Sequence, residues 1–211
     1  MSTNKSLKKL LKGYEIFRDK YAHGDQSIMH HLSRNGQQPK TMVIACCDSR
    51  VDPALILQCN PGDLFVVRNV ANIVPPYEKD EAHHGTSAAL EFGICYLHVE
   101  HLILLGHSQC SGIQALLKHD VLGQDDFITN WVTLIKTKDT KPKTASMKPK
   151  AIDECAKQSL HQSRQNCLTF PWIKERIEQG NLLIHLWFFD IKTGQIFTYS
   201  DEKKTYQPLA A

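Results

Sequence analysis

The sequence lacks the long apolar stretches that mark membrane-spanning and exported proteins. No run approaches the roughly 20 apolar residues of a transmembrane helix. Within residues 1–22 the longest apolar run is two residues, whereas a secretory signal needs about 7–15. Glu15 and Asp19 argue against an organellar transit peptide, which is usually poor in acidic residues. These absences predict a protein of the cytosol with no membrane partner.

Cysteine and net charge are also scarce. Seven cysteines among 211 residues are too few for a disulfide scaffold, and their odd number cannot pair completely, so we expect a reducing compartment. Lys and Arg exceed Asp and Glu by 25 to 22, and the resulting net charge of +3 is too small for a typical nucleic-acid-binding protein. With 42% hydrophobic and 22% charged residues, the composition is that of a globular protein. We expect a single domain over residues 1–211.

Apolar periodicity predicts an α/β fold. The predicted strands are 41–45, 64–67, 101–105, 182–189 and 195–200. The predicted helices are 54–58, 86–97, 113–118, 152–165 and 171–179. Strands and helices that alternate along the chain favour a mostly parallel central sheet flanked by helices. The last two strands, joined by a turn, are expected to extend this sheet.

The N-terminal segment 1–35 is predicted to form a helical arm. Between Leu7 and Tyr21 apolar residues recur with a helical period, and lysines occupy the other face. Such a helix either docks on the surface of its own chain or packs on a partner subunit. The sequence slightly favours docking on its own chain.

A lysine-rich segment interrupts the second half of the chain. Residues 136–150 hold six lysines and two prolines. A charge run of this kind usually forms a solvated loop, and a basic patch for a partner is the alternative. The segment does not divide the chain into domains.

Reactive side chains follow directly after two of the predicted strands. They are Cys46, Asp48 and Arg50 after strand 41–45, and His107 and Cys110 after strand 101–105. If both strands are parallel, both groups lie at the carboxyl edge of the sheet, where open α/β folds bind ligands. Two thiolates and one imidazole suit Zn²⁺, and three protein ligands leave the fourth position for water, as in catalytic sites. Cys46, His107 and Cys110 are therefore the predicted ligands of one zinc ion per chain.

Each of these residues has a plainer explanation when taken alone. A lone Cys in an apolar strand is most often a small core residue. A lone His is more often a structural side chain whose hydrogen bonds are satisfied than a metal ligand. The joint placement of the two groups, each one step past a buried strand, favours the metal interpretation.

Asp48 and Arg50 form either a salt bridge near a strand end or part of a catalytic centre. Two thiolates cancel the charge of the zinc ion, so the site acidifies a bound water less than three neutral histidines would. A carboxylate that accepts a hydrogen bond from the zinc-bound hydroxide would orient this nucleophile. Arg50 would hold the carboxylate by a bidentate, charge-assisted pair.

These motifs resemble those of the β-class carbonic anhydrases. The family's CxDSR and HxxC motifs stand here at 46–50 and 107–110, with RNVAN at 68–72 between them. The resemblance implies the reversible hydration of CO₂ to bicarbonate and a proton. It also implies zinc bound by Cys46, His107 and Cys110, and a catalytic dyad of Asp48 and Arg50. Cys47 occupies a variable position of the motif and is not expected to bind the metal.

The resemblance further implies a substrate pocket and an assembly. The residues that match pocket positions of the family are Gln37, Phe65, Val70, Phe92 and Ser111. Phe92 replaces a frequent Tyr, and Ser111 replaces a usual Gly whose backbone amide binds substrate. Gln37 matches a Gln that contacts substrate across a dimer interface, so a homodimer or an assembly of dimers is expected.

One subgroup of the family is inactivated when the catalytic Asp replaces water on the zinc ion. That subgroup carries a Trp three residues before the first ligand, at the position of Val43 here. Because Gln37 is present and this Trp is absent, the chain resembles the always-open subgroup, with Asp48 paired to Arg50 at neutral pH. Two alternatives stay open: a hydrolase of carbon disulfide or carbonyl sulfide on the same fold, and a non-catalytic, zinc-stabilised interaction domain.

Two further features have less specific interpretations. His83 and His84, which precede the predicted helix 86–97, are candidates for proton transfer to solvent, although the sequence does not single them out. Arg68 is predicted to be structural and to tie the 68–72 loop in place.

Overall fold

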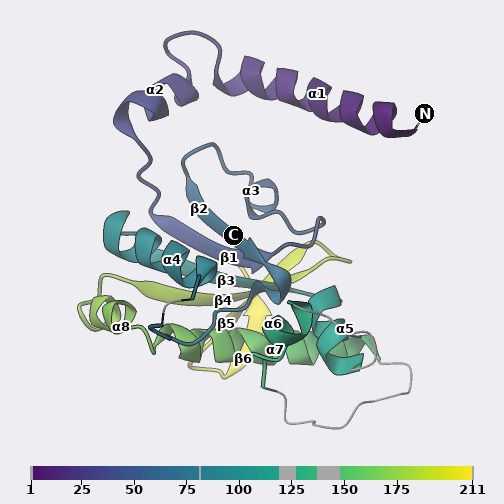
Figure 1. The fold of residues 1–211 in the computed structure, drawn as a ribbon, viewed down its shortest axis with the longest axis vertical. Coiled ribbons are helices and arrows are strands. Elements are labelled where there is room, and N and C mark those ends of the chain that lie inside the picture. The colour runs from purple at the N-terminus through teal and green to yellow at the C-terminus, as the bar shows by residue number, and fades with distance from the viewer. Residues whose placement is uncertain (1, 81, 119–126, 137–147, 211) are drawn as a thin grey trace.

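Six strands form one mixed sheet in a computed structural model of the chain, which describes residues 2–80, 82–118, 127–136 and 148–210 (Figure 1). In chain order they are β1 (Thr41–Cys46), β2 (Leu64–Asn69), β3 (His101–His107), β4 (Leu183–Asp190), β5 (Gln195–Ser200) and β6 (Thr205–Pro208). The spatial order is β2-β1-β3-β4-β5-β6; the first four strands pair in parallel, and β5 and β6 join antiparallel. The predicted fold, a mostly parallel sheet extended by C-terminal strands, is confirmed.

The central strands form where the sequence is almost continuously apolar. Every residue of β1 after Thr41 is buried, as is every residue of β3 after His101. Strands buried on both faces show such uninterrupted apolar runs. Helix α7 (Pro149–Cys167) packs against β3 and β4, and it comes so close to β3 that a side chain at Gly106 would meet Leu160. The two strands that carry the site therefore lie in the middle of the core.

The helices mostly match the predicted positions. They are α1 (Ser2–Tyr21), α2 (Ile28–Asn35), α3 (Pro53–Ile56), α4 (Gly85–Glu91), α5 (Ser111–Lys118), α6 (Ile128–Val132), α7 and α8 (Pro171–Glu178), with a 3₁₀ turn η1 (Val70–Asn72) and a π-helical turn η2 (Phe92–Tyr96). Asp52 caps α3 by accepting a hydrogen bond from the Leu55 amide, and Pro53 occupies the first turn. Helix α2 falls within the predicted helical arm 1–35, whereas helix α6 and strand β6 were not predicted.

The helix predicted over 86–97 is present, but its hydrogen-bond pattern changes in the second half. Regular α-helix ends at Glu91, and the π-helical turn η2 follows. This turn sets Gly93 against β1, where an added Cβ would lie only 2.7 Å from the Sδ atom of Met42. A π turn accommodates an extra residue within a helix, and it occurs here where the backbone must come close to the sheet.

The N-terminal arm does not dock on its own chain, contrary to the preference drawn from the sequence. Helix α1 extends away from the sheet (Figure 1), and its apolar residues are largely exposed, with Leu10 at 69% and Ile16 at 60%. Only its last turn, at Phe17 and Tyr21, borders a cavity, which Leu55 of α3 also lines. Nothing else in the described part of the chain covers the apolar face of α1. Packing on a partner subunit remains the prediction.

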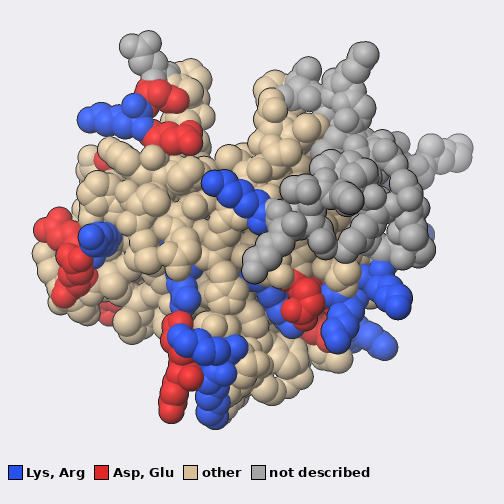
Figure 2. All heavy atoms as spheres, turned by 90° about the horizontal axis from the view of Figure 1, so that it is seen from below, with Lys and Arg blue, Asp and Glu red and all other residues tan. Residues whose placement is uncertain are grey.

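Two other expectations concern the lysine-rich loop 136–150 and the small net charge of the chain. Most of the predicted loop 136–150, namely 137–147, lies outside the described residues. On the face shown in Figure 2, acidic and basic side chains lie beside one another over the described surface. Among the helices of the described ranges, none is both long and apolar enough to cross a bilayer.

Candidate metal centre

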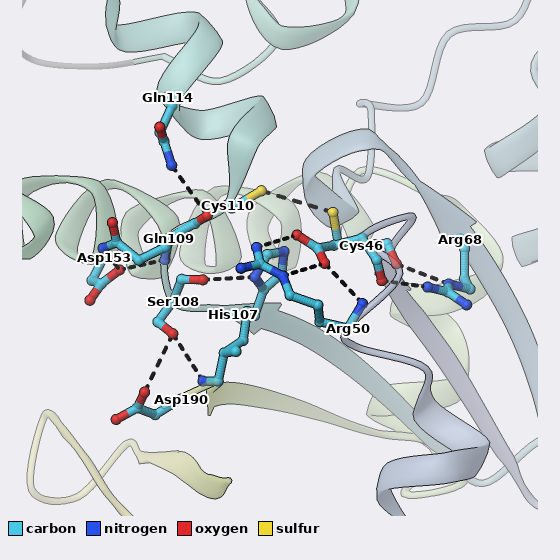
Figure 3. A network of polar contacts seen from close by, with 12 residues as sticks. Cys46, Arg50, Arg68, His107, Ser108, Gln109, Cys110, Gln114, Asp153 and Asp190 are labelled. Carbon is cyan, nitrogen blue, oxygen red and sulfur yellow. Dashed lines mark hydrogen bonds and ion pairs between the residues drawn. The ribbon is translucent and has the colours of Figure 1, made fainter. Parts of the chain in front are cut away.

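The carboxyl ends of β1 and β3 bring the three predicted ligands together. The two strands are parallel neighbours in the sheet, so Cys46 and His107 meet at one edge, and Cys110 follows in the turn before α5 (Figure 3). The Sγ atoms of Cys46 and Cys110 are 3.9 Å apart. The three candidate ligand atoms lie within 4.8 Å of one another, and all three residues are buried. The predicted convergence of the two segments is confirmed.

His107 presents one ring nitrogen that no protein group satisfies. Its Nδ1 atom is 2.9 Å from the carbonyl oxygen of Ser108, and donation to this oxygen leaves the lone pair on Nε2. Nε2 is buried and has no hydrogen-bond partner among the described residues. An unpaired buried polar atom costs free energy, and a metal ion beside two sulfurs would remove this cost. The donor set therefore fits Zn²⁺.

The two ligand cysteines are hydrogen-bonded to each other. The hydrogen bond with Cys110 holds the pKa of Cys46 far below its ordinary value. The same hydrogen bond, together with burial, raises the pKa of Cys110. A divalent cation would favour the thiolate of both residues, because it supplies the positive charge that the pair lacks.

The Asp48 carboxylate is held by Arg50. One carboxylate oxygen accepts hydrogen bonds from the backbone N and the Nε of Arg50 at 3.0 and 2.9 Å, and the other accepts from Nη2 at 2.7 Å. The Asp48 side chain is 11% exposed. These hydrogen bonds from Arg50 keep the pKa of Asp48 well below its usual range. The carboxylate is thus ionised, fixed and separate from the three clustered ligand atoms.

Arg68 is structural, as predicted, and it ties the 68–72 loop to the segment that follows β1. Its guanidinium donates to the carbonyl oxygens of Cys46 (2.9 Å) and Asp48 (2.8 Å) and to the Asp52 carboxylate (2.8 Å). The parallel pairing of β1 and β2 places Arg68 beside Ala45, next to these acceptors. Arg68 therefore fixes the segment that carries the first ligand and the acid.

Helix α7 supports the turn between His107 and Cys110. Gln109 has a left-handed backbone, with φ of 54°, and both its backbone N and its Nε2 donate to Asp153 Oδ1, at 2.8 and 3.0 Å (Figure 3). Ser108 is anchored on the other side, where its Oγ accepts from the Ile191 amide at 3.0 Å. The sequence did not reveal Asp153, since it lies 44 positions from Gln109 and belongs to no motif.

A small cleft opens beside the cluster and contains some of the predicted pocket residues. Its volume is about 370 Å³, and its lining is Cys46, Cys47, Asp48, Ser49, Arg50, Val70, Ser111 and Gly112. Val70 and Ser111 line this cleft, and their contact with substrate stays a prediction. Phe65 and Phe92 instead contact each other, with ring centroids 5.8 Å apart. Gln37 is exposed in the link between α2 and β1 and does not line the cleft of its own chain.

The turn that follows Cys110 requires a glycine at 112 rather than at 111. A Cβ at Gly112 would lie 2.7 Å from the Cγ1 of Val70 and 3.1 Å from the Cβ of Ala71. Ser111, by contrast, is exposed at the start of α5. The serine that departs from the family pattern is therefore accommodated without a close contact.

Comparison with known proteins identifies the family. Residues 41–196 match the family model described as carbonic anhydrase. Over 155 residues the sequence is 43% identical to β carbonic anhydrase 5, chloroplastic, of Arabidopsis thaliana, an alignment that covers 72% of this chain. The chain belongs to the β-carbonic anhydrase family. It spans about half (51%) of the length of that Arabidopsis relative.

Solved β-carbonic anhydrase structures share the fold. The β-carbonic anhydrase CcaA superposes with a TM-score of 0.84 at 30% sequence identity, covering 98% of this chain and 93% of that one. A tetrameric β-carbonic anhydrase of the ascomycete Sordaria macrospora gives a TM-score of 0.75 at 25% identity and covers 99% of both chains. The similarity to these structures therefore extends over nearly the whole chain, including the N-terminal arm.

Proposed function

We propose that this β-carbonic anhydrase family member catalyses the reversible hydration of CO₂ to bicarbonate and a proton, with one zinc ion held by Cys46, His107 and Cys110. The observation that carries the proposal is the buried, unpartnered Nε2 of His107 beside two cysteine sulfurs at the end of an open cleft. When bound, the zinc ion would lower the pKa of a water molecule and so supply a hydroxide nucleophile.

Asp48 and Arg50 have distinct tasks in this proposal. An ionised carboxylate can only accept hydrogen bonds, so Asp48 would accept one from the nucleophile. This hydrogen bond would leave the free lone pair of the nucleophile directed at the carbon of CO₂. Arg50 prevents the carboxylate from turning, because its backbone and side chain together make three hydrogen bonds to it. This pairing supports a site that stays open at neutral pH.

The substrate contacts are assigned to both apolar and polar groups. CO₂ is linear and weakly solvated, and an apolar wall with a few orienting polar groups suits such a ligand. Val70 would supply part of that wall, and the backbone amide of Ser111 would bind a substrate oxygen. We assign Phe65 and Phe92 to the outer part of the same apolar surface.

The assembly is proposed to be a homodimer or a set of dimers. Gln37 is exposed and outside the cleft of its own chain, so it could reach substrate only in a second subunit. The apolar face of α1 is exposed as well, and the Sordaria relative is described as tetrameric. Sedimentation of the full chain should give a dimer or larger, and a monomer at micromolar concentration would contradict the assignment of Gln37.

The compartment is proposed to be the cytosol. All seven cysteines are free in the structure, as in a reducing compartment. The Arabidopsis relative is named for the chloroplast, so the family is not restricted to one location. Fractionation of the source cells, with the protein detected by antibody, would test this placement.

The decisive experiment combines metal analysis with stopped-flow CO₂ hydration. The purified protein should contain one zinc ion per chain, lose CO₂ hydration when a chelator removes the metal, and regain it when zinc is restored. Turnover of carbonyl sulfide or carbon disulfide without CO₂ hydration would favour the hydrolase alternative. Bound zinc without any turnover would favour a zinc-stabilised interaction domain.

A further inference from the structure

A second, larger cavity adjoins the cleft of the metal centre. Its volume is about 710 Å³, and its lining is Cys47, Asn69, Val70, Pro75, Glu78, His83, His84, Gly85, Thr86, Ser87, Phe127, Ile128, Asn130, Trp131 and Leu134. Cys47 and Val70 line both cavities, so the two spaces meet at the residue that follows the first metal ligand. The groups that line the larger cavity therefore lie beside the cleft of the metal centre, with the far wall formed by the start of α4 and the residues before it.

Hydrogen bonds tie this far wall to the metal-binding segment. The carbonyl oxygen of Asn69 accepts from the Cys47 amide at 3.0 Å. The Nδ2 of the same Asn69 donates to the Oγ1 of Thr86, in the first turn of α4, at 3.3 Å. The start of α4, and His84 directly before it, are therefore held at a fixed place relative to Cys46.

His84, which lines the cavity, is oriented by the carboxylate of Asp80. Its Nε2 is 2.7 Å from the Oδ1 of Asp80, which also accepts from the Ala82 amide at 2.8 Å. The hydrogen bond from His84 lowers the pKa of Asp80, so this carboxylate is ionised at neutral pH. With Nε2–H donated to Asp80, the free lone pair of the ring is on Nδ1. The His84 side chain is 30% exposed, so it contacts both the cavity and the solvent.

The proposed reaction needs such a group. Each hydration of CO₂ releases one proton, which must reach a base in the solvent before the next turnover. His107 is a ligand, and the Asp48 carboxylate is engaged by Arg50. Among the described residues that line the two cavities, the other imidazoles are those of His83 and His84, and Glu78 is the additional carboxylate. His83 is exposed, and its ring makes no hydrogen bond within the described part of the chain.

We propose that His84, oriented by Asp80, is the proton relay of this enzyme. The inference rests on the proposed function. In each turnover the Nδ1 of His84 accepts the proton released by hydration, through water in the larger cavity, and the ring becomes a cation beside the Asp80 carboxylate. The ring then gives this proton to a buffer base and returns to its neutral form. One proton enters and one leaves, and no other bond changes.

The test compares variants of the zinc-loaded, full-length protein at low and high buffer concentration. For His84→Ala we expect kcat at low buffer to fall at least about tenfold. This factor is smaller than the roughly 100- to 10,000-fold that a positioned acid–base group usually contributes to the rate. The value of kcat/KM should stay within about twofold of the original, because a relay acts after the chemical step. Added imidazole should restore kcat.

Two further variants make the test specific. His83→Ala removes an imidazole from the same cavity and should leave kcat, kcat/KM and the buffer dependence unchanged. Asp80→Asn keeps the His84 ring but weakens its orientation, and it should give a smaller loss of kcat in the same direction. Zinc content and circular dichroism should be unchanged in all three variants.

Several results would overturn the relay. They are an unchanged low-buffer kcat in His84→Ala, a loss that imidazole does not restore, and an equal loss in His83→Ala. A parallel fall of kcat and kcat/KM would show a structural role for His84 instead. If the original zinc-loaded protein hydrates no CO₂ at any buffer concentration, the proposed function itself is wrong, which is a separate outcome.

Discussion

The two ends of strand β3 carry the same residue type in opposite circumstances. At the amino end, the Nδ1 of His101 lies 3.1 Å from the Nε2 of His185, and the two rings are partly buried. At the carboxyl end, His107 is only 1% exposed, and its Nε2 has no partner among the described residues. Burial combined with a missing hydrogen bond, rather than the presence of histidine, marks the metal centre.

The surroundings of the two ends differ in the same way. Near His101 the cationic groups are engaged by the protein: Lys40 pairs with Glu100 at 2.8 Å, and Arg176 donates to the carbonyl oxygens of Ile94, Val99 and Asn181. Near His107 two sulfurs join the imidazole, and the three candidate ligand atoms lie within 4.8 Å of one another. A cavity lies at each end of the strand, but the cluster of soft metal-ligating atoms lies at the carboxyl end. The following predictions test this contrast.

Replacing a sulfur ligand should have the largest effect. Cys110→Ser should lose zinc and reduce CO₂ hydration at least about a thousandfold, because a serine hydroxyl stays protonated near neutral pH and is a poor zinc ligand. Elemental analysis and stopped-flow kinetics would measure both. Cys47→Ser is the matched control, since Cys47 is exposed and outside the ligand cluster. Equal zinc content in the two variants would contradict the ligand set.

Neutralising the acid should leave the metal but remove most of the turnover. Asp48→Asn keeps the size of the side chain and loses the ionised acceptor that Arg50 holds, so kcat/KM should fall about a hundredfold or more. Zinc content should be unchanged, because Asp48 is not among the clustered ligands. Turnover equal to that of the original protein would show that the carboxylate does not orient the nucleophile.

Removing the hydrogen bonds that Asp153 of α7 accepts should lower the zinc affinity of the site without abolishing zinc binding. Asp153→Ala deletes the acceptor of both hydrogen bonds from Gln109, so zinc affinity should fall about 10- to 100-fold, as is usual for groups behind metal ligands. Competition with a chelator of known affinity would measure it. Glu154→Gln, at the next position of α7, alters only a 3.6 Å contact with Lys157 and serves as the control. A zinc affinity equal to that of the control would show that Asp153 does not support the metal site.

Replacing His185 of β4, which contacts His101 at the amino end of β3, should affect only the pH dependence of stability. Burial lowers the pKa of His185, so the unfolded chain binds this proton more readily than the folded one. The free energy of unfolding should therefore fall as the pH drops through the ordinary histidine value of about 6.5, by at most about 1.4 kcal/mol per pH unit for one proton. Urea titrations at several pH values should show that the free energy of unfolding of His185→Gln changes less steeply with pH. The zinc content and the CO₂ hydration activity should be unchanged. An identical slope would exclude His185 as the titrating group.

Much of the site-bearing half of the fold follows from local sequence. The runs at β1 and β3 are apolar throughout, which predicts buried parallel strands, and parallel neighbours necessarily bring Cys46 and His107 to one edge. The cap and first turn of α3 follow from Asp52 and Pro53 in the same way. These features depend on short segments whose conformation is determined by their own residues and not by contacts with distant parts of the chain.

Other features depend on contacts between distant segments and were not predictable. Strand β6 has four residues and exists through its pairing with β5. The π-helical turn η2 is coupled to the close approach of Gly93 to Met42, and the hydrogen bonds from Gln109 to Asp153 join the turn before α5 to helix α7. The exposed arm α1 shows the same limit, because an amphipathic pattern predicts a covered face without identifying what covers it.

The distance along the chain between the ligands has a consequence for how folding and metal binding are coupled. The unfolded polypeptide offers an ion only the local pair His107 and Cys110, whereas Cys46 arrives when β1 has aligned beside β3. If zinc is bound as proposed, its tight capture would be tied to completion of the sheet, and the ion would stabilise the native state alone. In a zinc-starved cell, newly made chains would remain closer to unfolding and more open to proteolysis, so metal supply would set the abundance of the enzyme as well as its activity.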